Sequence, residues 1–200
     1  MNLKSLLAFP FLYESFTGLL GGSKARSIYA KEYIQATSGN RVLDIGCGPG
    51  DIVEYMPSID YVGFDFNQKY IDSAVRNYKG RGLFFCGKVG EMSVDNPGSF
   101  DIALATGVLH HLSDNEALEL FKTAKEALKS GGRLVTLDGC FVSGQSKIAR
   151  FIIASDRGQF VRTREEYLKL ASSVFCEIKV IIRHDLLRIP YTHIILECTK

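Results

Sequence analysis

Short apolar runs alternate with stretches of mixed polarity along most of the chain, and turn-forming residues separate them. Such apolar runs are typical of buried strands, and the mixed stretches are typical of amphipathic helices. We expect strands at Val42–Ile45, Tyr61–Asp65, Leu83–Cys86, Phe100–Ala105 and Arg133–Leu137. We expect helices at Asp51–Met56, from about Asn67 to Tyr78, and at Asp114–Lys129 with Ser113 as its N-cap. Strands that alternate with helices predict a parallel sheet covered on both faces.

The pattern changes after the fifth expected strand. A partly helical segment precedes Thr163 and Glu166, which form a capping box for a helix that ends near Ser172. Glu177–Arg183 and Tyr191–Cys198 then follow as two strands with no helix between them. Strands joined in this way lie antiparallel. We therefore expect the sheet to end in a hairpin-like pair.

The first 36 residues are expected to form a helical segment that packs on the domain. Its apolar stretch Leu6–Tyr13 is interrupted by Pro10 and followed by Glu14, and no small-residue cleavage site comes after it. The stretch is far shorter than the ~20 residues that cross a bilayer, so we expect no stable membrane insertion. After Gly21 and Gly22, Ser23 is a candidate N-cap for a helix from about Lys24 to Ala36.

Composition narrows the class of protein. A chain of 200 residues with 46% hydrophobic and 23% charged residues fits a single domain, residues 1–200. The net charge of +2 gives no electrostatic case for nucleic acid. Five scattered cysteines favour reduced thiols in a cytoplasmic protein, and their spacing does not indicate a metal site.

The stretch Val42–Gly50 carries the clearest chemical signal, because a buried strand runs into a loop with glycine at 46, 48 and 50. Glycine lets a ligand approach the backbone closely. A carboxylate at Asp44 would repel a pyrophosphate and attract a cation. A dinucleotide fingerprint counted from Gly46 would need glycine where Asp51 stands, at a helix start that should meet the phosphates. The loop therefore favours a cationic nucleoside over a nicotinamide dinucleotide.

This loop resembles the first motif of the class I S-adenosylmethionine-dependent methyltransferases. The segment Phe100–Leu112 and the Gly131-Gly132 pair with the strand after it are also similar to that family, so the resemblance extends from about Arg41 to Leu137. It implies a doubly wound, Rossmann-like α/β fold: a seven-stranded, mostly parallel sheet of order 3-2-1-4-5-7-6 with one antiparallel strand. It also implies S-adenosylmethionine as cofactor, S-adenosylhomocysteine as product and no metal.

The resemblance assigns a set of cofactor residues. Asp65 ends the second strand about 20 residues past the glycine loop, a position that suits hydrogen bonds from both ribose hydroxyls. One position departs from the family pattern: Lys88 stands where an aspartate often accepts from the adenine amino group, and lysine cannot accept. Glu91 or a backbone carbonyl could replace that contact. The cofactor set is Tyr13, Asp44, Gly46, Cys47, Gly48, Gly50, Asp65, Phe66, Lys88, Val89 and Thr106.

Catalysis of methyl transfer needs a general base only where the acceptor must lose a proton. His110 and His111, after the fourth strand, are the candidates, and we favour His110 because adjacent side chains do not easily face one site. The alternative is that both histidines bond the backbone and hold the loop.

Acceptor contacts are expected from the N-terminal segment 1–36, acting as a lid, and from the insertion 141–163. Phe16, Arg157 and Arg162 are the candidate residues, because arginine can bind a carboxylate or phosphate with two hydrogen bonds. A solvated loop with local ion pairs is the alternative for the two arginines. We expect a small-molecule acceptor and allow a homodimer. A methyltransferase acting on protein or RNA, and a cofactor-binding module without catalysis, remain as alternative functions.

Overall fold

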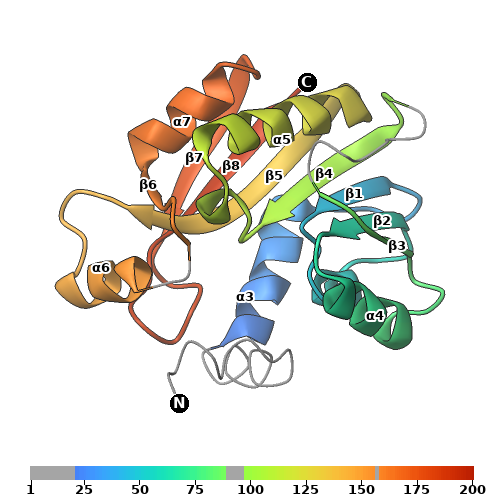
Figure 1. Cartoon of the computed structure of the whole chain (residues 1–200), viewed down its shortest axis with the longest axis horizontal. Helices are drawn as coiled ribbons and strands as arrows, with labels where there is room; N and C mark the ends of the chain where they lie inside the picture. The colour runs from blue at the N-terminus through green and yellow to red at the C-terminus, as the bar shows by residue number, and fades with distance from the viewer. Residues whose placement is uncertain (1–20, 89–96, 156–157) are drawn as a thin grey trace.

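The computed structural model describes residues 21–88, 97–155 and 158–200, and it has one central sheet between two layers of helices (Figure 1). The strands are β1 Arg41–Ile45, β2 Asp60–Asp65, β3 Leu83–Cys86, β4 Phe100–Thr106, β5 Leu128–Phe141, β6 Arg162–Thr163, β7 Glu177–Arg183 and β8 His193–Thr199. The helices are α3 Gly22–Tyr29, α4 Gln68–Asn77, α5 Asp114–Ala127, α6 Lys147–Ala154 and α7 Arg164–Ser172. Three short turns of other helix types are η1 Ala30–Ile34, η2 Asp51–Tyr55 and η3 Leu109–His111.

The sheet has the order β3-β2-β1-β4-β5-β8-β7, and the two-residue β6 pairs with β5 outside this path. β8 is antiparallel to both of its neighbours, and the pairs from β3 to β5 are parallel. The predicted fold is confirmed. Because β6 was not expected, the last two strands carry numbers one higher than in the predicted order.

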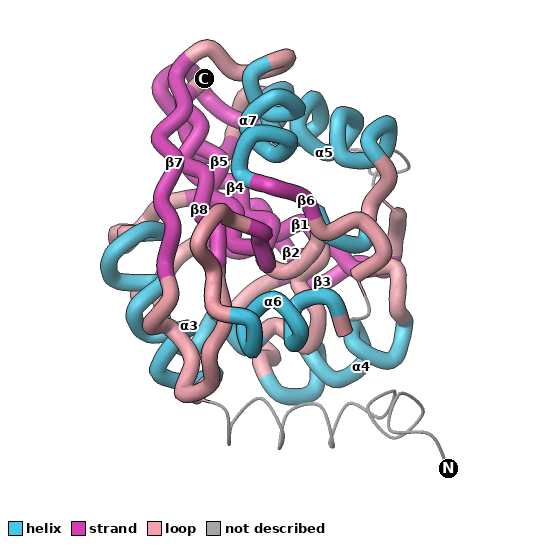
Figure 2. The backbone as a smooth tube through the Cα atoms, turned by 90° about the vertical axis from the view of Figure 1, so that its left-hand side faces the viewer, coloured by secondary structure: helices cyan, strands magenta, loops and turns pink. Residues whose placement is uncertain are grey.

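Alternation along each central strand divides the core into two layers. Leu43 and Ile45 of β1 face the side covered by α5 and α7, whereas Val42 faces the side of α3 and η2. Figure 2 shows α5 and α7 on one side of the sheet, and α3 and α4 on the other. The two layers hold the carboxyl ends of β1, β2, β4 and β5 along one edge.

At two helix ends, glycines have a different role from the one the sequence predicts. Gly21 with φ 94°, and not Ser23, precedes the first helix, which begins at Gly22 and passes into the π-helical turn η1. The helix α5 ends at Ala127, and β5 starts at Leu128 instead of Arg133. The Gly131-Gly132 pair lies at a register shift between β4 and β5, where a Cβ on Gly132 would come within 3.1 Å of two β4 carbonyl oxygens. The glycines therefore permit a bulge within the strand and do not end the helix.

Three predicted helix starts are confirmed. Asn67 accepts a hydrogen bond from the Lys69 backbone N–H at 3.1 Å, and Ser113 and Thr163 both form capping boxes. Among the described residues, no helix is long and apolar enough to cross a membrane.

Two phenylalanines test the layered core. Phe121 of α5 is 0% exposed and packs against Phe175, whereas Phe151 of α6 is 72% exposed. We expect Phe121→Ala to lower the free energy of unfolding by about 3 to 5 kcal/mol, because it leaves a cavity. Phe151→Ala is the matched control and should change it by less than about 0.5 kcal/mol. Urea denaturation measures both, and equal losses would contradict this packing.

Candidate active site

Three strands carry a buried aspartate near the carboxyl edge of the sheet: Asp44 on β1, Asp65 on β2 and Asp138 on β5. In parallel sheets, ligands bind beyond this edge where the strand order reverses, which here is between β1 and β4. Buried carboxylates are costly unless they are paired or serve a ligand. Their shared edge identifies the candidate site.

The glycine loop after β1 is held close to β2. Gly46 and Cys47 both donate backbone N–H groups to the Phe64 carbonyl, at 2.7 and 2.9 Å. Gly46 has φ 77°, and a Cβ there would lie 2.4 Å from a methyl of Val108. A Cβ on Gly48 would meet nothing within 4 Å among the described residues. The loop is therefore tight at its start and open at Gly48, where a ligand can reach the backbone.

Asp44 is only partly satisfied. The Tyr61 hydroxyl donates to its Oδ2 at 2.6 Å, while its buried Oδ1 has no hydrogen-bond partner among the described residues. Burial raises the pKa of Asp44 to about 6, the Tyr61 hydrogen bond opposes that shift, and the negative charge of Asp65 adds to it. An unpaired buried carboxylate oxygen fits a cationic ligand group.

Asp65 is oriented by the loop that it faces. Its Oδ2 accepts from the Gly48 backbone N–H at 3.0 Å, and its Oδ1 accepts from the Asn67 N–H at 2.8 Å. Burial raises the pKa of Asp65, and the two backbone donors oppose the shift. Each carboxylate oxygen has a second lone pair, so both can still accept from a pair of ligand hydroxyls.

Asp51, at the end of the glycine loop, binds other residues of the protein. It forms an ion pair with Arg26 of α3 at 2.8 Å, and the Tyr78 hydroxyl donates to it at 3.3 Å. The carboxylate thus links the first described helix to η2 at the end of the glycine loop. It fixes this loop against α3.

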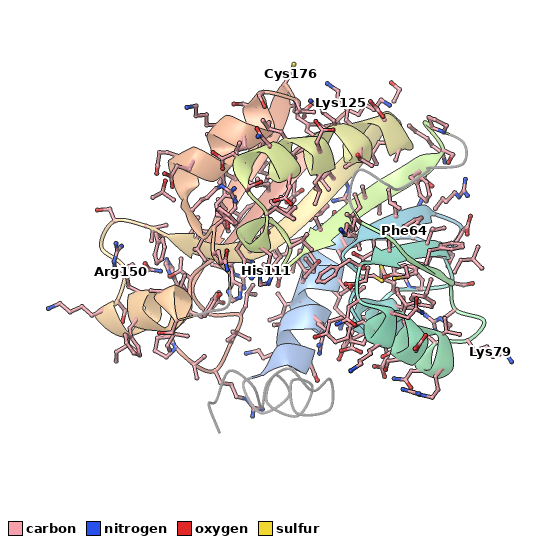
Figure 3. All side chains as sticks on the ribbon, in the orientation of Figure 1. Phe64, Lys79, His111, Lys125, Arg150 and Cys176 are labelled. Atoms are coloured by element: carbon pink, nitrogen blue, oxygen red, sulfur yellow. The ribbon has the colours of Figure 1, made fainter. Side chains whose placement is uncertain are left out.

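A histidine and an aspartate form a buried pair beyond β4. His110 Nδ1 lies 2.7 Å from Asp138 Oδ1, and the His110 backbone N–H donates to the same oxygen at 3.2 Å. An ionised carboxylate only accepts, so Nδ1 then carries the proton. Burial raises the pKa of Asp138, and its contacts with His110 oppose that shift. Figure 3 places His111 between α6 and α3, and its ring centroid is 4.1 Å from that of His110.

Comparison with known proteins supplies the family. A family model described as a methyltransferase domain matches residues 42–132. This part of the chain is similar to a methyltransferase domain. The match contains the glycine loop, Asp65 and His110, and the resemblance to the class I S-adenosylmethionine-dependent methyltransferases is confirmed.

Proteins similar to this chain are named for different methyltransferase substrates. The tRNA U34 carboxymethyltransferase of Campylobacter lari is 31% identical over 125 residues, which are 60% of this chain and 42% of that protein. A Haemonchus contortus phosphoethanolamine N-methyltransferase 2 structure, holding phosphomonomethylethanolamine and S-adenosylhomocysteine, has a TM-score of 0.70 at 17% identity over 88% of this chain and 52% of that one. A TehB-like S-adenosylmethionine-dependent methyltransferase from Corynebacterium glutamicum gives 0.62 at 19%, over 88% and 87%. The chain spans 42%, 24% and 42% of the first three curated relatives, under half of each.

The candidate site contains a residue that the sequence analysis missed. Asp138 follows the apolar stretch of β5, as Asp44 and Asp65 follow theirs. This position after an apolar stretch is the signal in the sequence that points to it. The sequence alone could not predict that Asp138 contacts His110, because the two residues are 28 positions apart.

Arg162 was expected to bind the acceptor, and the structure gives it another role. It is 5% exposed and donates five hydrogen bonds, at 2.7 to 3.1 Å, to the carbonyls of Leu109, Leu112 and Phe160 and twice to Asp114 Oδ1. A guanidinium has five N–H donors. Because all five are used within the protein, the prediction that Arg162 contacts the acceptor is wrong.

The remaining predicted site residues lie as follows. Cys47 turns its sulfur inward against Gly63, and burial raises the pKa of its thiol. Thr106 ends β4, Phe66 follows β2 with 74% of its surface exposed, and Lys88 is exposed after β3. Tyr13, Phe16, Val89, Glu91 and Arg157 lie outside the described residues.

The burial of Asp44 predicts a pH-dependent stability. Its pKa in the folded protein, about 6, is above the ordinary value of 3.8. The folded state therefore binds the proton more tightly, and wild type loses stability as pH rises from about 4 to about 6. We expect Asp44→Asn, which cannot ionise, to gain roughly 2 to 3 kcal/mol over wild type across that window.

Chemical denaturation at a series of pH values measures this difference. Asp185→Asn is a control of opposite sign, because Arg183 lowers the pKa of the exposed Asp185 to about 2. Its carboxylate stabilises the fold above that pH. A pH-independent difference between wild type and Asp44→Asn would contradict the assigned burial.

Proposed function

We propose that the chain is an S-adenosylmethionine-dependent methyltransferase that transfers a methyl group to a small-molecule acceptor by in-line displacement, leaving S-adenosylhomocysteine. The observation that carries the proposal is the pair of buried carboxylates around an open glycine loop. Asp44 has an unpaired oxygen among the described residues, and Asp65 is oriented by Gly48. The cofactor has positive charge on its sulfonium and ammonium groups, and two ribose hydroxyls.

The residues at the loop fit this cofactor better than a pyrophosphate. Asp44 supplies negative charge for the cationic end, and Asp65 can accept from the ribose hydroxyls. The exposed ring of Phe66 follows directly and can cover a face of the nucleoside. Lys88 cannot accept from the adenine amino group, so a backbone carbonyl or Glu91 has to do so.

Bound S-adenosylmethionine supplies a methyl carbon that its sulfonium has already activated. The chain's own residues then have to position the acceptor and manage its proton. His110 accepts that proton at Nε2, because Asp138 holds Nδ1 and stabilises the imidazolium that forms. A buried histidine–aspartate pair serves an acceptor that must lose a proton, and a hydroxyl group fits this need best.

The small-molecule acceptor is supported by charge and by a structural relative. A net charge of +2 offers little attraction for RNA, and a relative of the same fold was solved with phosphomonomethylethanolamine. A tRNA acceptor is the second candidate, because the Campylobacter lari relative is named for one. A binding module without catalysis is the third, on account of Lys88. A homodimer remains a prediction that analytical ultracentrifugation would test.

Cofactor binding is tested by titration calorimetry with S-adenosylmethionine and S-adenosylhomocysteine. We expect Asp65→Ala to weaken both about 10- to 100-fold, whereas Asp72→Ala, on the exposed face of α4, leaves them unchanged. Wild-type affinity for S-adenosylmethionine should fall about tenfold per pH unit below pH 6, where Asp44 takes up its proton. If neither ligand binds, or if Asp65→Ala binds as wild type does, the proposed cofactor site is wrong.

The acceptor class is tested with labelled S-adenosylmethionine and fractionated cell extract. A labelled product of low mass supports the proposal, labelled RNA or protein supports the second candidate, and no label supports the third. We expect His110→Gln and Asp138→Asn each to lower the rate about 100-fold or more while cofactor affinity changes less than about threefold. His184→Gln is the matched histidine control. An unchanged rate in His110→Gln would exclude it as the base.

A further inference from the structure

The insertion after β5 returns to the sheet at β6 and encloses the loop that carries His110. In both Figure 1 and Figure 2, β6 lies above α6. Three contacts join this return to the histidine loop: the Phe160 N–H donates to the His110 carbonyl at 3.0 Å, Gly158 packs on the ring, and Arg162 donates to the carbonyls of Leu109 and Leu112. We propose that Arg162 is a positioning residue for the His110–Asp138 pair, and that Asp114 is the counter-charge that adjusts its effect.

Arg162 holds the histidine loop on both sides of His110 and His111. The carbonyls of Leu109 and Leu112 lie on either side of His110 and His111 in the chain, and a single guanidinium holds both, at 2.8 and 2.7 Å. The same guanidinium donates to Asp114 Oδ1 from Nε and Nη2, at 3.0 and 2.7 Å. Asp114 is in the first turn of α5. Arg162 therefore fixes both ends of η3 against the start of the next helix.

The segment that carries Arg162 also packs closely against the His110 imidazole ring. A Cβ on Gly158 would lie 2.2 Å from His110 Cδ2 and 2.8 Å from the His110 carbonyl oxygen. The backbone at Gly158 thus forms one wall for the imidazole, and Asp138 bonds its Nδ1. Since Arg162 also holds the Phe160 carbonyl at 3.1 Å, it links that wall to the loop.

The charge of Arg162 also acts on the His110–Asp138 pair. The positive charge of Arg162 lowers the pKa of Asp138, whose Oδ2 is buried with no partner among the described residues. A cation near the pair opposes a proton on it, and the negative Asp114 reduces that opposition. Asp114 is 73% exposed, so solvent screens its share. Among the described residues, the titratable or charged groups around the pair are His111 on η3, Asp114 on α5, Cys140 on β5, Arg162 on β6, Tyr167 on α7 and Tyr29 on α3.

Two substitutions should move the titration of His110 in opposite directions. Arg162→Gln removes the cation, so we expect the midpoint of His110 protonation to rise by about 0.5 to 1 pH unit. Asp114→Asn leaves the cation without its counter-charge, so the midpoint should fall by about 0.2 to 0.3 unit. Arg164→Gln, on the neighbouring exposed arginine, is the matched control and should leave the midpoint in place.

The measurement is a nitrogen-15 NMR titration of the four histidine rings in the full chain, with His110→Gln to assign the His110 signals. In wild type we expect neutral His110 to carry its proton at Nδ1, and in Arg162→Gln a mixture of both tautomers. A merely structural role would lower stability without opposite shifts. If Arg162→Gln does not fold, Asp114→Asn still decides, because it leaves the buried side chains intact.

Unchanged midpoints in folded Arg162→Gln and Asp114→Asn, or shifts of equal sign, would overturn the proposal. The importance of this positioning for turnover rests on the proposed function, but the titration needs neither cofactor nor acceptor. A failed methyl-transfer assay with a positive titration would therefore reject the enzyme and keep the positioning role. The reverse result would keep the enzyme and reject the role.

Discussion

The site depends on the burial of Asp44, whose carboxylate has a single hydrogen-bond donor, Tyr61, among the described residues. A buried charge with so little compensation is unfavourable, and its pKa rises accordingly. The fold tolerates this because Asp44 sits in the middle of the sheet, between β2 and β4, where the parallel strands fix its position. Burial of the Asp44 charge destabilises the folded state, and a cationic ligand that binds beside this carboxylate can offset that cost.

Two supports keep the surrounding loop in place around that unsatisfied charge. Asp65 bonds the Gly48 N–H from one side, while the Arg26–Asp51 ion pair holds the far end of the loop to α3. The three acids therefore have different roles: Asp44 offers charge, Asp51 fixes the loop through Arg26, and Asp65 orients the loop. In the proposed function, Asp65 also accepts from the ribose hydroxyls. Three carboxylates around one loop suit a cationic nucleoside and would repel a phosphate.

Sequence reasoning recovered those parts of the fold and site that local pattern determines. Strand positions, the capping boxes at Ser113 and Thr163, and the acids at strand ends all follow from neighbouring residues. It failed where a distant contact decides. Gly131-Gly132 has the sequence of a helix end, yet β5 runs through it, because Leu128 pairs with Phe100 of β4 and both glycines form backbone hydrogen bonds with Lys200. Arg162 has the sequence of a ligand-binding arginine, and only the folded chain brings three carbonyls and Asp114 to its guanidinium.

At the carboxyl edge of the sheet, the polar groups on β1 and β2 and those on β4 and β5 are held by different parts of the chain. On the side of β1 and β2, Asp44 and Asp65 are held within the two strands and the glycine loop: the Tyr61 hydroxyl donates to Asp44, and the Gly48 N–H donates to Asp65. On β4 and β5 the His110–Asp138 pair is enclosed by an insertion that returns as β6, and Gly158 and Arg162 from that insertion touch the loop directly. A substitution in that insertion would therefore also disturb the His110–Asp138 pair.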